Sequence, residues 1–321
     1  MIAVAALSPA LDVSYVVDDL VLGEPHRPTS VVRVAGGKAL NSARAAVRLG
    51  AAVTAVPVLG GHLGGLVAAL LDADGVTAEV VESPTETRQC VSIASAAGGT
   101  LTEIYERPVA LGDDELSQVL EGLERVAGAG SWVSLSGGLP AGAEPVLGDL
   151  ARLCAAKGAH LALDTHGPAL RSVLGSFGVG LLKVNRAEAA EALDLPLDVE
   201  LSSLVSALRE AAGSDVVVTD GAHGSIAADA SGLWRVALPP AAGSFGAYPV
   251  GSGDSYLGGL LAALDTGADL PASVALAAGA ATANALVPGA AVFDASVARS
   301  LAARVVVTPL AARSPDLLAQ L

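Results

Sequence analysis

Residues 181–219, LLKVNRAEAAEALDLPLDVELSSLVSALREAAGSDVVVT, contain the pattern that decides the fold. An apolar run at 181–184 is followed by helix-like segments at 186–193 and 201–212, and then by a valine-rich run at 216–219. A strand, a helical crossover and a second strand form a βαβ unit, which joins two parallel strands. This stretch therefore predicts a parallel sheet with helices covering both of its faces.

The same alternation continues along most of the chain. Further strands are expected at 2–7, 53–59, 132–135 and 161–163, and further helices at 38–49, 66–73, 115–126, 146–157, 255–264 and 272–286. The 321 residues contain no long linker, short-period repeat or low-complexity tract. We therefore expect a single α/β domain over residues 1–321.

Two pairs of apolar segments lack a helix between them. Segments 13–17 and 29–34, and segments 90–94 and 101–105, are expected to pair as strands, the second pair through the turn at 96–99. Without crossover helices, these strands either extend the main sheet or form a small sheet of their own. We favour a separate sheet, formed by about residues 12–34 and 87–106, that covers the carboxyl edge of the main sheet as a lid.

Composition restricts the class of function. The net charge of −15 disfavours binding to nucleic acid or to anionic membranes. Segment 270–293 is long and uncharged enough for a membrane span, but its proline, glycine and polar residues favour a buried helix. The N-terminus lacks the basic residues of a signal peptide, and Cys90 and Cys154 have no metal or redox spacing. We expect a cytoplasmic protein with reduced thiols and no structural metal site.

The strongest chemical signal is the turn Pro249-Val250-Gly251-Ser252-Gly253-Asp254-Ser255, which leads into a helix. Glycines let successive N–H groups converge, and the helix N-terminus adds a partial positive charge. Both features suit a phosphate oxygen or the negative charge that develops during phosphoryl transfer. Asp254 could then accept the proton of an attacking hydroxyl. The alternative is an ordinary glycine turn in which Asp254 is only a helix cap.

A second glycine turn, Ala35-Gly36-Gly37-Lys38-Ala39-Leu40-Asn41, also begins a helix. The glycines would admit a ligand close to the backbone, where Lys38 and Asn41 could bind sugar hydroxyls or a phosphate. Lys38 is not followed by Ser or Thr, so this is not a Walker A loop. A helix start without a ligand is the other interpretation.

Two strands are expected to end in polar residues at the same edge of the sheet. Asn185 and Glu188 could hold Mg²⁺ through water, or could form a capping box, and the two roles are compatible. Thr219, followed by Gly221 and Gly224, could contact donor phosphates, or could belong to a plain hairpin turn.

Taken in order, these motifs resemble those of the PfkB (ribokinase-like) carbohydrate kinases, in particular the 1-phosphofructokinase and tagatose-6-phosphate kinase branch. The resemblance runs from about residue 2 to residue 307. Its carriers are Leu7-Ser8-Pro9-Ala10-Leu11-Asp12, Gly36-Gly37-Lys38 with Asn41, Thr102-Glu103-Ile104, Ser136-Gly137-Gly138-Leu139-Pro140, Lys183 with Asn185 and Glu188, Gly221 with Gly224, and Gly251-Ser252-Gly253-Asp254.

The resemblance implies a ribokinase-like three-layer sandwich around a mostly parallel sheet, with a small β-sheet lid. It implies transfer of the γ-phosphate of ATP, with Mg²⁺, to a sugar hydroxyl. Asp254 would be the catalytic base, and Gly251, Ser252 and Gly253 would complete the anion hole. The remaining roles would be sugar binding by Asp12, Gly36, Gly37, Lys38, Asn41, Arg88 and Ser136, nucleotide binding by Lys183, Asn185, Thr219, Gly221, Gly224 and Asn284, and a water-mediated Mg²⁺ contact by Glu188.

Three positions depart from the branch. Ser92 stands where the lid strand usually has a lysine that meets the phosphate of the acceptor, since the segment here reads Thr87-Arg88-Gln89-Cys90-Val91-Ser92. Val184 replaces a proline, and Tyr105 stands where an asparagine is common. Because contacts between a cation and a phosphate are strong, Ser92 bears directly on which acceptor is used.

The expected substrate is a hexose phosphate of the fructose 1-phosphate, fructose 6-phosphate or tagatose 6-phosphate type. One alternative is an unphosphorylated sugar, cyclitol or nucleoside, and another is a sugar or nucleotide sensor without catalysis. A nicotinamide dehydrogenase is disfavoured because no G-x-G-x-x-G follows the first strand. The free edges of the lid sheet also suggest a homodimer.

Overall fold

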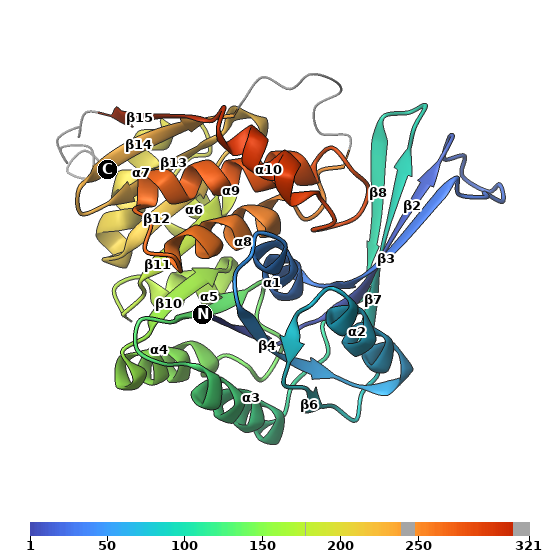
Figure 1. Ribbon diagram of the computed structural model, residues 1–321, viewed down its shortest axis with the longest axis horizontal. Coiled ribbons are helices and arrows are strands. Elements are labelled where there is room, and N and C mark those ends of the chain that lie inside the picture. The colour runs from blue at the N-terminus through green and yellow to red at the C-terminus, as the bar shows by residue number, and fades with distance from the viewer. Residues whose placement is uncertain (177, 239–247, 311–321) are drawn as a thin grey trace.

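The computed structural model describes residues 1–176, 178–238 and 248–310 (Figure 1). Within these residues the main sheet has the strand order β15-β14-β13-β12-β11-β10-β9-β1-β4-β5, and β6 pairs with β4. Its strands are β1 (Ile2–Ala6), β4 (Val53–Leu59), β5 (Thr77–Ala78), β6 (Val81–Glu82), β9 (Trp132–Ser136), β10 (His160–Asp164), β11 (Leu181–Asn185), β12 (Asp215–Thr219), β13 (Ser225–Asp229), β14 (Gly232–Ala237) and β15 (Val306–Leu310). The predicted parallel pairing of β11 with β12 is confirmed, and antiparallel pairs occur only at the β13–β15 end of these described strands.

Helices cover both faces of the main sheet, so the predicted three-layer sandwich is confirmed (Figure 1). One face is covered by α1 (Lys38–Arg48), α2 (Gly61–Ala73), α8 (Ser252–Leu264), α9 (Leu270–Asn284) and α10 (Ala295–Ala302), and the other by α3 (Asp113–Val126), α4 (Val146–Lys157), α5 (Gly167–Val173), α6 (Arg186–Ala192) and α7 (Leu201–Ala212). Strand β1 shows how the two layers are built, because Ile2 and Val4 join the first core and Ala3 and Ala5 join the second. Because successive side chains point to opposite faces of the sheet, both faces of the strand are buried.

A separate four-stranded sheet has the order β3-β2-β7-β8. Its strands are β2 (Ala10–Val17), β3 (Ser30–Gly36), β7 (Arg88–Ser95) and β8 (Thr100–Tyr105). The pairs β2–β3 and β7–β8 are antiparallel, and β2 lies parallel to β7. The expectation of a small sheet apart from the main one is thus confirmed, whereas its action as a lid stays a prediction.

The long uncharged segment divides into a helix and a turn. Helix α9 ends at Asn284, before Pro288 and Gly289, and it packs against α8 and α10. The buried-helix interpretation is therefore confirmed. Among the described helices, none has both the length and the apolar character that a membrane span requires.

Helix starts are less well predicted than helix interiors. Helix α2 begins at Gly61, five residues before the predicted start, and α8 begins at Ser252, inside the glycine turn. In both cases glycine residues occupy the first turn and interrupt the apolar pattern on which the prediction depends. The correction at α8 matters for function, because it places Asp254 within the first turn of a helix.

Substitution of two helical glycines by alanine is expected to change the stability in opposite directions. A Cβ at Gly279 would lie 2.4 Å from the carbonyl oxygen of Ala298, whereas a Cβ at Gly65 would meet nothing within 4 Å. Gly279→Ala is expected to lower the free energy of unfolding by roughly 1–3 kcal/mol, because α9 and α10 must separate. Gly65→Ala, also inside a helix, is expected to raise it by about 0.5–1 kcal/mol. Urea denaturation measures both, and an equal effect of the two substitutions would contradict this account of the packing.

Candidate functional site

A polar cleft lies where the parallel strands end. Ser8 follows β1, Ser136 ends β9, Asn185 ends β11 and Thr219 ends β12, and all four line the cleft. The small sheet supplies the opposite wall through β2, β7 and β8. Open α/β sheets bind ligands at the carboxyl ends of their strands, so this is the expected place for a site.

Two carboxylates in the cleft are bridged by one amide. The Nδ2 atom of Asn41 donates to Oδ2 of Asp254 over 3.0 Å and to Oδ2 of Asp12 over 3.3 Å. Burial raises the pKa of Asp254 to about 6, although the nearby charge of Lys38 acts in the other direction. Burial also raises the pKa of Asp12. The site thus holds Asp254, which can exchange a proton near neutral pH, beside Asp12, and the amide of Asn41 donates to both carboxylates.

The glycines of the second turn make this approach geometrically feasible. A Cβ at Gly36 would overlap the carboxyl group of Asp12, and the N–H of Gly37 donates to Oδ2 of Asp12 over 3.3 Å. Gly37 has φ 86° and lies against the carbonyl of Ser8. Gly36 does not itself line the cleft, so it contributes by leaving space for Asp12.

The turn before α8 leaves two backbone donors available. Gly251 has φ 77°, and a Cβ there would lie 2.4 Å from the Cβ of Ala290. The N–H of Ser252 is bonded to the carbonyl of Pro249 and that of Ser255 to the carbonyl of Gly251. In the described part of the chain the N–H groups of Gly253 and Asp254 have no partner. A helix N-terminus with free donors beside a carboxylate can bind an anion close to a proton acceptor.

Two lysines flank this turn and share one buried carboxylate. Lys183 donates to Asp164 over 2.6 Å, and Lys38 lies 3.6 Å from the other oxygen of the same carboxyl group. Burial alone would raise the pKa of Asp164, but the charges of Lys183 and Lys38 hold it below its ordinary value. The ammonium of Lys183 also lies 3.2 Å from the position of a Cβ on Gly253. Lys183 is therefore held beside Gly253, whose N–H group is free.

Asp164 and His166 were missed at the sequence level. Asp164 ends β10 and His166 follows two residues later, next to Gly138 in the cleft wall. The available signal was the same one that identified Asn185, a polar side chain directly after a buried strand. Glu103 and Tyr105 of the small sheet also line the cleft; Glu103 belongs to a motif of the resemblance, and Tyr105 is one of the three departures from the branch.

Asn185 and Glu188 form the capping box that the sequence suggested. The side chain of Asn185 accepts from the N–H of Glu188 over 2.9 Å, and Glu188 accepts from the N–H of Asn185 over 2.8 Å. Oε1 of Glu188 remains 3.7 Å from Lys38, and both residues line the cleft. In the described residues no group of three metal-binding side chains occurs. A single carboxylate such as Glu188 suits a Mg²⁺ ion that keeps most of its water ligands.

An apolar pocket adjoins the cleft and shares Thr219, Pro249 and Gly253 with it. Gly221 and Gly224, which the resemblance assigned to the nucleotide, line this pocket, and so does Ser252. Asn284 lines neither space. Its buried amide donates to the carbonyl of Val250 and to Oγ of Ser252, so it supports the turn from behind.

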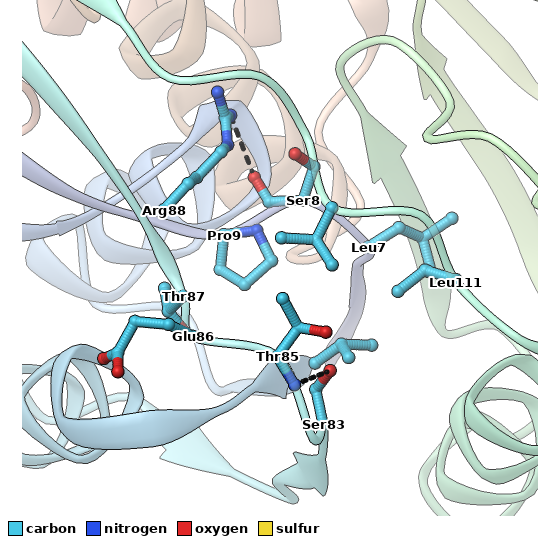
Figure 2. A pocket seen from close by; sticks show the side chains of 11 residues that line it. Leu7, Ser8, Pro9, Ser83, Thr85, Glu86, Thr87, Arg88 and Leu111 are labelled. Carbon is cyan, nitrogen blue, oxygen red and sulfur yellow. Dashed lines mark hydrogen bonds between the residues drawn. The ribbon is translucent and has the colours of Figure 1, made fainter.

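Arg88 connects the small sheet to the first strand of the main sheet (Figure 2). Its guanidinium donates to the carbonyl of Ser8 over 3.1 Å and to that of Glu106 over 3.0 Å. Figure 2 shows Arg88 reaching toward Ser8 and Pro9, above a small pocket lined by Leu7, Thr85 and Leu111, among others. Arg88 is therefore partly occupied with backbone contacts, although it also lines the cleft.

Unpaired polar atoms gather in the cleft. In the described residues, Oγ of Ser8, Oδ1 of Asn41, Oγ of Ser136 and Nε of Arg88 are buried without a hydrogen-bond partner. All four residues line the cleft. Buried polar groups normally have partners, so the cleft is prepared for a ligand with several hydroxyl groups or oxygens.

Comparison with known proteins agrees with this geometry. Phosphofructokinase-2 from Escherichia coli, solved in complex with potassium, matches with a TM-score of 0.86 and 26% identity over 94% of this chain and 98% of its own. A possible 1-phosphofructokinase from Thermotoga maritima has a TM-score of 0.84 at 20% identity, covering 97% of this chain and 99% of its own. A putative phosphofructokinase from Staphylococcus aureus has a TM-score of 0.79 at 22% identity with the same coverage. These last two show the fold.

The sequence itself matches the model of the pfkB family carbohydrate kinases over residues 2–295. That match includes the bridged carboxylates, both glycine turns and the strands that end at the cleft. Because it extends over far more than half of the 321 residues, the chain belongs to the pfkB family of carbohydrate kinases.

Proposed function

We propose that this kinase transfers the γ-phosphate of ATP to a hydroxyl of a hexose phosphate of the fructose 1-phosphate, fructose 6-phosphate or tagatose 6-phosphate type, with Asp254 as general base. Family membership makes the chain a phosphotransferase that acts on a sugar or phosphosugar hydroxyl, with ATP as co-substrate. One observation supports the choice of Asp254 as the base. The amide of Asn41 joins Asp254 to Asp12 in the polar cleft, beside the free N–H groups of the turn.

On the acceptor side, Asp12, Asn41 and Lys38 are proposed to hold the sugar. Asp12 accepts hydrogen bonds, and Asn41 has an unpaired Oδ1 in the same cleft. Gly37, Ser136 and Arg88 supply further contacts on the cleft wall. Held in this way, a hydroxyl would lie beside Asp254, which takes its proton as the oxygen attacks phosphorus.

On the donor side, the N–H groups of Gly253 and Asp254 are proposed to bind the transferred phosphoryl group. Lys183 lies next to them and offsets the negative charge that spreads over the phosphoryl oxygens. Glu188, with Asn185, would hold Mg²⁺ through water, and the bound ion would neutralise part of the charge on the phosphates. The apolar pocket with Gly221 and Gly224 would take the nucleoside.

The small sheet is proposed to close over the acceptor and to exclude water, which limits hydrolysis of ATP. Its outer strands, β3 and β8, carry unpaired edges in the described sheet, so we also propose that two subunits associate there as a homodimer. Two buried free cysteines support a reducing, cytoplasmic location.

A second candidate is a kinase of an unphosphorylated sugar, cyclitol or nucleoside. Across the small sheet Ser92 pairs with Ser14 on one side and with Glu103 on the other, and all three line the cleft. Tyr105 donates to Glu103, so this row offers hydroxyls and a carboxylate. A carboxylate at this end repels a phosphate and accepts hydrogen bonds from hydroxyls, which favours a neutral acceptor.

ADP release across a panel of acceptors tests the proposed reaction. The panel contains fructose 1-phosphate, fructose 6-phosphate, tagatose 6-phosphate, free hexoses and a nucleoside, each with ATP and Mg²⁺. Asp254→Asn is expected to lower kcat by roughly 10²–10⁴-fold, because the base is lost while the shape of the site is kept. No turnover of any acceptor, with ATP still bound, would support the sensor instead.

The same variant needs a check on folding. The pKa of Asp254 is about 6 when folded and 3.8 when unfolded, so its contribution to stability is present below pH 3.8 and lost as the pH rises through 6. Asp254→Asn has no such loss. It is therefore expected to be at least as stable as the parent protein at pH 8, as measured by thermal unfolding.

The raised pKa of Asp254 also predicts the acid limb of the pH profile. Because kcat/KM reports the free enzyme, it is expected to fall as the pH drops through about 6, where Asp254 takes up a proton. Steady-state kinetics from pH 5 to pH 8 measure it, and a kcat/KM that stays constant down to pH 5 would contradict Asp254 as the base.

Ser92→Lys discriminates between the two classes of acceptor. A lysine at 92 would offset Glu103 and face the cleft, so kcat/KM for a hexose phosphate is expected to rise by roughly tenfold relative to a neutral sugar. Ser92→Gln has a similar length without the charge and is the matched control. An equal change in both variants would show that size, not charge, determines the preference at this position.

A further inference from the structure

Helix α1 carries two arginines that share one carboxylate. Nε of Arg44 donates to Oδ2 of Asp74 over 2.5 Å, and Nη2 of Arg48 donates to Oδ1 of the same residue over 2.9 Å. The side chain of Arg44 is only 1% exposed, and burial lowers its pKa. A buried guanidinium is expensive to desolvate, so its place in the core calls for a reason other than packing.

Each arginine also binds the backbone of one of two consecutive residues. Nη1 of Arg44 donates to the carbonyl of Ala290 over 2.9 Å, and Nε of Arg48 donates to the carbonyl of Ala291 over 2.7 Å. Ala291 has φ 52°, a conformation that is uncommon for a residue with a Cβ. The surroundings must therefore hold this short segment in place, and the two arginines do so from one side.

The segment held by the arginines backs the phosphate-binding turn. Ala290 packs against Gly251, where no Cβ would fit. The N–H of Ala291 donates over 2.7 Å to Oδ1 of Asn284, whose amide nitrogen binds the carbonyl of Val250 and the hydroxyl of Ser252. A continuous chain of contacts thus runs from Arg44 and Arg48 to the turn that presents the free N–H groups.

The same helix also positions the base. Asn41, Arg44 and Arg48 are spaced three and four residues apart, so they lie on one face of α1. Asn41 binds Asp254, and α8 packs closely on α1, since a Cβ at Gly258 would lie 2.5 Å from the carbonyl of Ser42. Helix α1 therefore fixes both the proton acceptor and the segment behind the anion donors.

We propose that Arg44 and Arg48, joined by Asp74, are positioning residues for phosphoryl transfer. They hold the Ala290–Ala291 backbone against Gly251, which keeps the N–H groups of Gly253 and Asp254 in register with the acceptor. Neither arginine lines the cleft or the adjoining pocket. This role rests on the proposed function, because it concerns the transition state of that reaction.

The proposal predicts an effect on the chemical step more than on binding. The arginines support the donor side of the turn, so their loss is expected to lower kcat while the KM of the acceptor changes little. Arg44 also lies near Asp12, and its positive charge favours the ionised form of the Asp12 carboxyl group. An action through Asp12 would instead raise the KM of the acceptor, so the two parameters separate the explanations.

Arg48→Met is the primary variant, because Arg48 is 30% exposed and its loss endangers folding less than that of Arg44. We expect kcat to fall by about tenfold, less than the ~100-fold that a 1 Å displacement can cause, with the acceptor KM within about twofold. Arg48→Lys, which keeps one donor, is expected to recover part of kcat. Arg299→Met is the matched control, since Arg299 donates to the carbonyl of Leu49 at the end of the same helix and, among the described residues, makes no hydrogen bond to the turn.

Hydrogen exchange supplies a measurement that does not depend on the acceptor. The peptide covering residues 249–255 is expected to exchange faster in Arg48→Met than in the parent protein or in Arg299→Met. Unchanged kcat and unchanged exchange in Arg48→Met, with only a lower melting temperature, would overturn the positioning role. A higher acceptor KM at unchanged kcat would also overturn it. Faster exchange in a protein that phosphorylates nothing on the panel would reject the proposed function and leave the positioning of the turn intact.

Discussion

The structure of the site depends on one amide that lies between two carboxylates. Asp12 comes from the small sheet, Asp254 from the first turn of α8, and Asn41 from the first turn of α1, and the side chain of Asn41 binds both acids. Each carboxylate has a pKa raised by burial, so without the shared donor they would be more costly to keep ionised in one cleft. The glycines at 36, 37 and 258 follow from this constraint, because they let the three elements approach.

Several of the few lysines and arginines of this acidic protein lie in or behind the cleft. Of 18 lysines and arginines, Lys38, Lys183 and Arg88 line the cleft, and Arg44 and Arg48 stand behind the turn. Asp164 and Asp74 each hold two of these cations in place. Paired in this way, the lysines would already be oriented when the proposed nucleotide binds, and its phosphates would meet a preorganised positive region in a protein of net charge −15.

The sequence reveals the parts of this site that are local. The glycine turn before α8, the capping box of Asn185 with Glu188 and the alternation of strands and helices all depend on residues close together in the chain. The Arg44–Asp74 pair and the supporting role of Asn284 escaped prediction, because their partners come from elements distant in sequence. A buried ion pair produces no periodic pattern in the sequence, so only the folded structure distinguishes Arg44 from an exposed arginine on a helix.

Chemistry and acceptor preference occupy different parts of the fold. The proposed base, the free N–H groups and Lys183 belong to the main sheet and its helices, whereas Ser14, Ser92, Glu103 and Tyr105 belong to the small sheet. Strand β7 contacts the rest of the cleft through Arg88 and through its pairing with β2, and in the described residues no hydrogen bond joins β7 or β8 to Asp254. A substitution on β7 or β8 can therefore change which end of an acceptor is tolerated without moving the groups that transfer the phosphoryl group. Under the proposed function, Ser92 in place of the branch's lysine would change the acceptor specificity and leave the turn before α8 intact.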